Sequence, residues 1–283
     1  MGDAVYDAAR TFNHRPFKLR EHIDRLYRSA RYTRMPIRLT PEAMEKHTLE
    51  VIEHNMPLLG SNDDDMIWWT VTRGVNPVTR SVLDCQEATV IICTFPVPFR
   101  AFAKWMIRGA RVVTPSVRRT PPECLDPKAK VSNKMNHILA DLEVKGADPD
   151  AYSLMLDITG NLAENSGANF FFVKRGQLCT PTGYNILEGI TRATIIELAQ
   201  SFGTPVVEGS FTPYDVYTAD EAFLTTTTYC ILPVAQLNGA PIGRETPGPL
   251  TRQLIAAWNT LVGVDIVAQA LTQLEPEPIP VQR

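Results

Sequence analysis

A proline-rich segment divides this chain of 283 residues into two parts. Residues 118–128 read RRTPPECLDPK, and three prolines with several charges over so short a stretch are typical of a connection between folded parts. The length is also comfortable for two domains. We therefore expect an N-terminal α+β domain over residues 1–117, a connection over 118–129, and a larger C-terminal domain with a tail over 130–283.

Both parts carry patterns of helices and strands, which predicts an α+β fold. Apolar residues at helical spacing or a helix cap mark the predicted helices: residues 17–33, a second beginning at Thr40-Pro41, 136–144, 191–202 and 250–262. Runs of β-branched and aromatic residues mark the predicted strands: residues 66–73, 88–95, 109–117, 152–158, 162–173, 177–180, 205–208 and 222–227. The proline-rich C-terminal sequence LEPEPIPVQR predicts a loose end.

The composition argues against several kinds of partner. Hydrophobic residues make up 44% of the chain and charged residues 21%, which is the balance of an ordinary globular protein. Because binding to nucleic acid or to an anionic membrane usually requires a concentrated basic surface, a net charge of -3 favours neither. No apolar run approaches the roughly 20 residues of a membrane span, and the N-terminal sequence has no apolar signal core, so we expect a cytoplasmic protein.

We predict no metal site. The five cysteines are scattered and form no CxxC pair, and the five histidines show no metal-ligand spacing. Cys93 and Cys230 lie in apolar runs and are most simply small core residues.

Lys130 is the first candidate for chemistry. It follows the proline-rich connection and precedes an amphipathic helix, so we expect it at a junction between domains, where ligand sites concentrate. Partial burial there would lower the pKa of its amine, as imine formation requires. A solvated surface lysine is the alternative, and Lys134 and Lys128 are nearby rivals.

Glu164 is the second candidate, within the sequence LAENSGAN. A carboxylate between apolar and small residues is either a turn residue or a buried partner for a basic group. Opposite a pyridine nitrogen, it would keep that nitrogen protonated.

The segment LEGIT, residues 187–191, ends a loop and starts a helix. The N–H groups of a first helical turn, together with the helix dipole, attract phosphate, although a plain helix cap at Thr191 is the common interpretation. Four threonines at residues 225–228 either end a strand or add donors for the same phosphate. Arg25 either supplies a positive charge or lies on a helix surface.

These elements together suit one cofactor, pyridoxal 5′-phosphate (PLP). Its aldehyde needs an amine, its ring nitrogen needs an acidic partner, and its phosphate needs backbone N–H groups. Each element alone is a weak signal, but the three in this order are a strong one. Tyr6, Trp68 and Trp69 are plausible pocket walls, although neighbouring residues of a strand face opposite sides and one tryptophan would then belong to the core. Of the two, we choose Trp69 as the substrate contact.

The chain resembles the class IV aminotransferases, which are PLP enzymes of fold type IV, over about residues 2–262. The segments EHIDRLYRSA, VTRG, AKVSNKMNHILADLE, GNLAENSGANFFFV, LEGITRATIIELA and EAFLTTTTYCILPV fall in family order. The resemblance implies a small α/β domain, a larger domain like a mixed β-barrel, and a homodimer in which the neighbouring subunit completes the pocket. It also implies that the first strands of the small domain are missing, because the chain starts at the GDAVYD segment.

The resemblance implies residue roles as well. Lys130 corresponds to the lysine that forms the imine and shuttles the proton, and Glu164 to the carboxylate on the pyridine nitrogen. The residues that correspond to phosphate contacts are Arg25, Ile190 through its backbone, Thr191 and Thr227. The expected substrate contacts are Tyr6, Trp69, Thr226 and Thr228.

The implied reaction is transfer of an amino group between an amino acid or amine and a 2-oxo acid, in the manner of a branched-chain aminotransferase. An (R)-selective amine:pyruvate transaminase and an aminodeoxychorismate lyase are alternatives within the family. A D-amino-acid aminotransferase is disfavoured, because Val78 and Arg80 stand where that enzyme has an arginine and a histidine. A binding protein with inherited PLP-like features is the non-enzymatic alternative.

Overall fold

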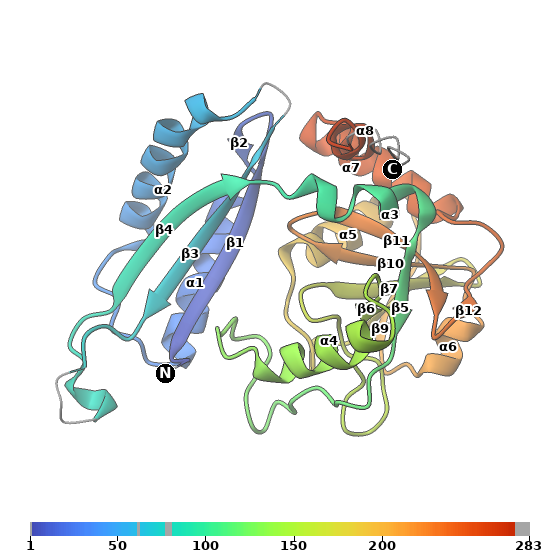
Figure 1. Ribbon diagram of the computed structural model, residues 1–283, viewed down its shortest axis with the longest axis horizontal. Helices are drawn as coiled ribbons and strands as arrows, with labels where there is room; N and C mark the ends of the chain where they lie inside the picture. The colour runs from blue at the N-terminus through green and yellow to red at the C-terminus, as the bar shows by residue number, and fades with distance from the viewer. Residues whose placement is uncertain (1, 61–62, 77–80, 275–283) are drawn as a thin grey trace, which may run out of the picture.

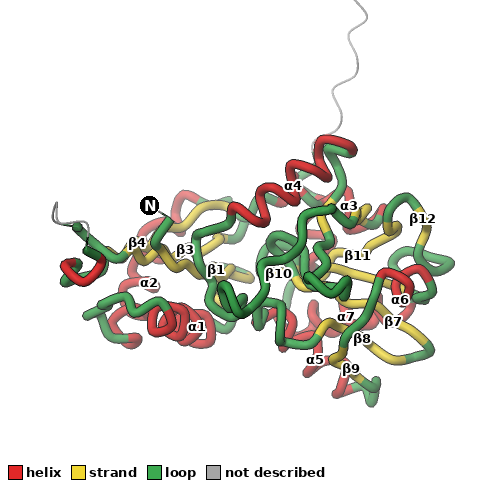
Figure 2. Tube along the Cα trace, turned by 90° about the horizontal axis from the view of Figure 1, so that it is seen from below, coloured by secondary structure: helices red, strands yellow, loops and turns green. Residues whose placement is uncertain are grey.

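The computed structural model describes residues 2–60, 63–76 and 81–274. Within these residues, a four-stranded antiparallel sheet is built from the N-terminal third of the chain, and an eight-stranded mixed sheet is built from the remainder. The two sheets and their helices lie side by side, with loops gathered between them (Figures 1 and 2). The predicted α+β fold in two parts is therefore confirmed.

The small sheet has the strand order β2-β1-β3-β4. Its elements are β1 (Ala4–Phe12), β2 (Arg15–Pro16), α1 (Leu19–Tyr32), α2 (Pro41–Asn55), η1 (Met56–Leu58), β3 (Asp65–Thr72), η2 (Val82–Asp84) and β4 (Thr89–Pro96). Helices α1 and α2 cover one face of the sheet (Figure 1). On that face, Ile67 and Trp69 are fully buried against Ile23 and Leu26 of α1. The opposite face, which carries Tyr6 and Trp68, is left to line a cavity.

The large sheet has the order β6-β5-β11-β10-β7-β8-β9, with β12 beside β11. Its strands are β5 (Ala110–Val113), β6 (Tyr152–Ser153), β7 (Asn169–Lys174), β8 (Gln177–Pro181), β9 (Val206–Gly209), β10 (Glu221–Thr226), β11 (Cys230–Leu237) and β12 (Ala240–Pro241). The accompanying helices are η3 (Phe99–Ala101), α3 (Ala103–Arg108), α4 (Met135–Ala147), α5 (Ile190–Ser201), α6 (Pro213–Tyr217), α7 (Pro249–Val262) and α8 (Ile266–Leu271). Its core contains Phe171 and Phe223, whose rings stack 5.2 Å apart between β7 and β10.

The boundary between the two parts lies earlier than the sequence suggested. β5 pairs in parallel with β11, with Ala110 opposite Val234, so this strand belongs to the large sheet rather than to the N-terminal domain. The chain crosses between the sheets over residues 97–109, which contain η3 and α3. Residues of the segment expected as the connection, 118–129, instead line the cavity. A local pattern identifies a strand but not its partner, which here is more than a hundred residues away.

Three predicted strands are shorter than expected. The one predicted at residues 109–117 spans only Ala110–Val113, and the other two are shortened around one loop. The run at residues 162–173 becomes a strand only from Asn169, because residues 162–168 form the loop that holds Glu164. Likewise, β6 ends at Ser153, and the chain then pairs with this loop through Met155, whose N–H donates to the Glu164 carbonyl at 3.1 Å.

Apart from Leu274, the predicted loose end at residues 274–283 lies outside the described residues, as do Val78 and Arg80. Within the described residues, no helix is long and apolar enough to cross a membrane.

Candidate active site

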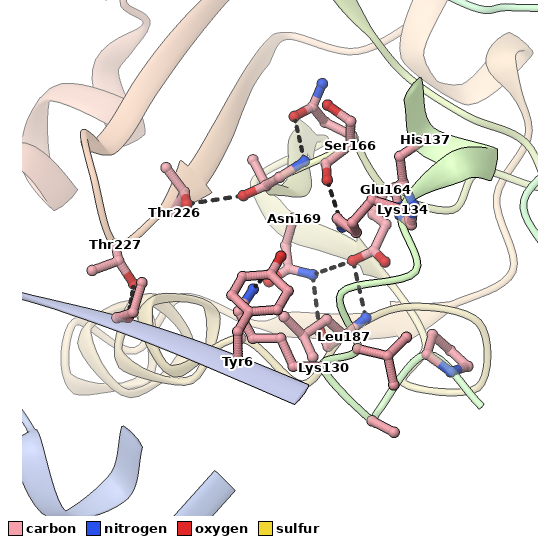
Figure 3. A pocket seen from close by; sticks show the side chains of 18 of the residues that line it. Tyr6, Lys130, Lys134, His137, Glu164, Ser166, Asn169, Leu187, Thr226 and Thr227 are labelled. Carbon is pink, nitrogen blue, oxygen red and sulfur yellow. Dashed lines mark hydrogen bonds between the residues drawn. The ribbon is translucent and has the colours of Figure 1, made fainter. Parts of the chain in front are cut away.

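A cavity of about 260 Å³ lies between the two sheets. The small sheet contributes Tyr6 and Trp68, and the large part contributes Lys130 with the segments that contain Glu164 and Ile190. The labelled side chains of Figure 3 converge on this space from both sides. The structure thus brings together residues that are more than 180 positions apart in the chain.

Lys130 is fixed by its backbone and presents its amine to the cavity. Its N–H donates to the Ser29 hydroxyl on α1 at 3.0 Å, and its carbonyl accepts from the Tyr6 N–H on β1 at 3.0 Å. The amine donates to the Tyr6 hydroxyl at 3.3 Å and lies 4.4 Å from the centre of that ring. Burial, followed by the nearby Arg25 charge, lowers the pKa of the Lys130 amine to about 8. An amine with this pKa is available as a nucleophile near neutral pH.

Glu164 is a buried carboxylate with partners on both oxygens. Its Oε1 accepts from Nε and Nη2 of Arg119, each at 3.3 Å. Its Oε2 accepts from the Leu187 N–H at 2.9 Å and from the Asn169 amide at 3.2 Å. Neither Arg119 nor Asn169 was predicted from the sequence, although both hold this carboxylate at the cavity wall. Figure 3 shows the contact between Asn169 and Glu164.

The start of α5 leaves backbone N–H groups open beside the cavity. The residue before the helix, Gly189, supplies no side-chain cap, so N–H groups of the first turn, from Ile190 onward, stay available. A Cβ at Gly189 would lie 2.0 Å from Oδ1 of Asn169, so only glycine fits this close approach. Thr191 is buried beside the cavity, where its hydroxyl adds a donor.

Arg25 faces this helix start from the small sheet. Its Nη1 donates to the Glu188 carbonyl at 3.1 Å, while Nε and Nη2 each donate to Asp7 at 2.8 Å. The ring of His22 contacts Asp7 through Nδ1 at 2.8 Å. Burial alone would raise the pKa of Asp7, but the charge and hydrogen bonds of Arg25 hold it well below its usual range. Asp7 carried no signal in the sequence, because its partners become neighbours only in the fold.

The four threonines at residues 225–228 all line the cavity. The Thr227 hydroxyl donates to the Ala8 carbonyl at 3.2 Å, and the Thr226 hydroxyl donates to the Gly167 carbonyl at 2.9 Å. The Thr228 carbonyl accepts from Arg10 at 2.9 Å. The buried Thr225 hydroxyl has no hydrogen-bond partner among the described residues. This turn therefore links β1 to the end of β10 and leaves polar groups at the cavity wall.

The structure corrects the choice between the two tryptophans. Trp69 is fully buried in the core of the small sheet, where its indole N–H donates to the Thr48 hydroxyl at 2.8 Å. Trp68 faces the cavity and stacks on Tyr6, with ring centres 4.8 Å apart. The rival Lys128 is exposed, beside Asp126, and is not part of the cavity wall.

Residues 4–237 match the family model described as amino-transferase class IV, and the chain belongs to this family. It is 38% identical to a putative branched-chain-amino-acid aminotransferase of Methanocaldococcus jannaschii, over 89% of this chain and 85% of the relative. It is 32% identical to a D-alanine aminotransferase of Listeria monocytogenes, over 90% of this chain and 85% of the relative.

Solved structures of branched-chain amino acid aminotransferases share this fold. The enzyme of Escherichia coli has a TM-score of 0.83 and 29% identity, over 92% of this chain and 86% of the other. A second such enzyme, whose structure contains pyridoxamine 5′-phosphate, has a TM-score of 0.85 and 31% identity, over 93% of this chain and 86% of the other.

The protein is therefore a PLP-dependent enzyme that transfers amino groups, as the sequence predicted. The groups in the cavity fit this cofactor on chemical grounds. An amine with a lowered pKa, a buried carboxylate and an uncapped helix start meet in one space, and these are the three partners that PLP requires.

Proposed function

We propose that this enzyme moves the amino group of a branched-chain amino acid to a 2-oxo acid. The observation that carries the proposal is the apolar wall beside the Lys130 amine, which is formed by Tyr6 and Trp68 together with Met66. Such a wall suits an aliphatic substrate side chain, because their contact removes apolar surface of both the side chain and the wall from water.

The residues that would hold the cofactor follow from the geometry of the cavity. Lys130 would bind its aldehyde carbon, and Glu164 would hold its ring nitrogen. The phosphate would be held by Arg25, Thr227 and the first turn of α5, including the Ile190 N–H and the Thr191 hydroxyl. When bound, PLP supplies an electron sink for the carbanion that forms at the Cα of the amino donor.

The chain's own groups then move one proton. Once the amino donor has displaced it, the amine of Lys130 would accept the proton of the donor Cα at Nζ. It would later return this proton to the former aldehyde carbon of the cofactor. Its pKa of about 8 suits both steps near neutral pH. The Tyr6 hydroxyl, which accepts from this amine at 3.3 Å, orients it. Arg119 and Asn169 hold the Glu164 carboxylate where it would meet the ring nitrogen of the cofactor.

The expected homodimer is also part of this proposal. The face of β4 that continues beyond Trp68 leaves Ile91 and Phe95 exposed, and the Phe95 ring lies 6.3 Å from that of Trp68. Helix α4 likewise exposes Met135 and Leu142. A second copy that covers these surfaces would complete the apolar wall. Sedimentation at micromolar concentration tests this expectation, because a monomer would contradict it.

Substrate preference is tested by half-reactions of PLP-loaded protein with single donors. L-leucine is expected to convert the bound cofactor to its amine form, and 2-oxoglutarate to convert it back. The relatives named D-alanine aminotransferase support a second candidate, so D-alanine is the matched comparison. Faster conversion by D-alanine, or by (R)-1-phenylethylamine, would replace the branched-chain proposal.

A further inference from the structure

Lys134 is a second lysine in the cavity, shortly after Lys130 in the chain. It stands immediately before α4 and extends its side chain toward Ser166, whose carbonyl accepts from Nζ at 2.9 Å (Figure 3). Burial lowers the pKa of this amine, with a further contribution from the charge of Lys130. The proton-transfer and cofactor-binding steps described above do not use it.

The other cations of the cavity are accounted for. Arg25 is paired with Asp7, and Arg119 with Glu164. The amine of Lys130 would be used to bind the cofactor aldehyde. Among the described residues, no carboxylate lies within ion-pair distance of Lys134, and its hydrogen-bond partner is a neutral carbonyl.

A partly buried ammonium without an anion is unfavourable, because a carbonyl dipole replaces only part of the hydration that burial removes. Two of its three N–H donors also remain free for a ligand. The groups that face it are Tyr6 from β1, Arg119 and Lys130 from the segment before α4, His137 from α4 itself, and Glu164 from the loop before β7. Glu164 is already occupied by Arg119, Asn169 and Leu187.

We propose that Lys134 binds an anionic oxygen that the ligand brings into the cavity, either the ring oxygen of the cofactor or the carboxylate of the substrate. This deepens the proposed function, on which the identity of the ligand rests. Lys134 would then favour ligands with an oxygen anion over neutral ones of the same shape. A role confined to holding the Ser166 loop would give no such preference.

The first test compares Lys134→Met with Lys134→Arg, which keeps the charge, and with Lys128→Met, which removes an exposed lysine outside the cavity. Thermal unfolding is measured for each protein with and without PLP. We expect apo Lys134→Met to unfold at the wild-type temperature or above it, because a partly buried charge without an anionic partner is gone. The proposal would be overturned if apo Lys134→Met unfolded at a lower temperature than the wild type while apo Lys134→Arg unfolded at the wild-type temperature. Lys134 would then serve only to hold the Ser166 loop.

Two further arms separate the sources of the anion. Without substrate, the absorbance of bound PLP is titrated with pH. If the ring oxygen is the partner, loss of the cation raises the midpoint by about one pH unit or more in Lys134→Met. The second arm measures the binding of 4-methylvaleric acid and of its neutral amide. If the substrate carboxylate is the partner, Lys134→Met should bind the acid about tenfold more weakly than the wild type does and should bind the amide equally well. No change in either arm would overturn the proposal.

Turnover of L-leucine by the wild-type enzyme is measured in parallel. Absence of that turnover would count against the branched-chain proposal. The pH titration and the probe binding can still be measured on PLP-loaded protein that does not turn over L-leucine. The two failures therefore remain distinguishable.

Discussion

Asp7 binds the guanidinium of Arg25 through two hydrogen bonds of 2.8 Å, and so fixes a buried cation opposite the start of α5. The two residues lie on β1 and α1 of the small sheet, whereas the Glu188 carbonyl that Arg25 also contacts belongs to the large part. This pair therefore joins the two halves of the molecule at the place where we expect the phosphate.

Replacing Asp7 with Asn tests that pair. The substitution leaves the Arg25 charge buried without a carboxylate, which we expect to reduce the free energy of unfolding by about 3–5 kcal/mol and to weaken PLP binding. Urea unfolding and a PLP titration measure both effects. Glu42→Gln is the matched control, since it breaks the exposed contact with Arg20 and should change neither. Unchanged PLP affinity in Asp7→Asn would contradict the role given to Arg25.

Gly189→Ala probes the approach of the loop to Asn169. Because the new Cβ would lie 2.0 Å from Oδ1 of Asn169, the start of α5 or the amide must move, and with it a partner of Glu164. We expect PLP affinity to fall about tenfold or more, the effect of losing roughly one charge-assisted hydrogen bond. At Gly183, a Cβ meets nothing within 4 Å, so Gly183→Ala should bind PLP normally. Equal affinities for the two variants would refute the steric argument.

The lowered pKa of Lys130 predicts how the apoenzyme captures PLP as a function of pH. Burial and the Arg25 charge disfavour the ammonium form, and only the free amine attacks an aldehyde. The rate should therefore rise about tenfold per pH unit below pH 8 and become constant above about pH 8. Stopped-flow absorbance measures this profile. A rate that keeps rising to pH 10 would mean that the reacting lysine has an ordinary pKa.

The two adjacent tryptophans should separate stability from substrate binding. Trp69→Ala empties part of the small core and should cost about 3–5 kcal/mol of unfolding free energy. Trp68→Ala removes the cavity wall that stacks on Tyr6, so it should raise the KM for L-leucine severalfold with a smaller loss of stability. Steady-state kinetics and urea unfolding of both variants give the comparison. The reverse pattern would restore Trp69 as the substrate contact.

Local signals were sufficient for much of the fold. The Thr40 cap of α2 is an example, because its hydroxyl accepts from the Ala43 N–H at 3.2 Å as the residue pattern predicts. The chemistry-bearing Lys130 and Glu164 were also visible, because their flanking sequences are distinctive. What a local pattern lacks is the partner across the fold. Arg119 meets Glu164 from 45 positions away, and their contact could not be predicted without the path of the chain between them.

The sequence also does not show which strands pair in one sheet, because strand partners can be far apart in the chain. Pro233 argues against a central strand by the local rule, yet β11 lies between β5 and β10 in the large sheet. Its neighbours β5 and β10 lie before and after the part of the chain that contains Lys130, Glu164 and Ile190. The sheet can therefore form only when that part of the chain has folded back. The sequence likewise predicts that Trp68 and Trp69 face opposite sides of their strand. It does not show which side packs against α1, because that depends on where the helix lies in the fold.

Lys130, rather than Lys134, is the residue that we expect to bind PLP covalently. Borohydride reduction of the loaded enzyme, followed by digestion and peptide mass spectrometry, locates the bond directly. We predict a pyridoxyl group on Lys130 and its loss in Lys130→Ala. A pyridoxyl group on Lys134 in the wild-type enzyme, or no adduct at all, would contradict the account.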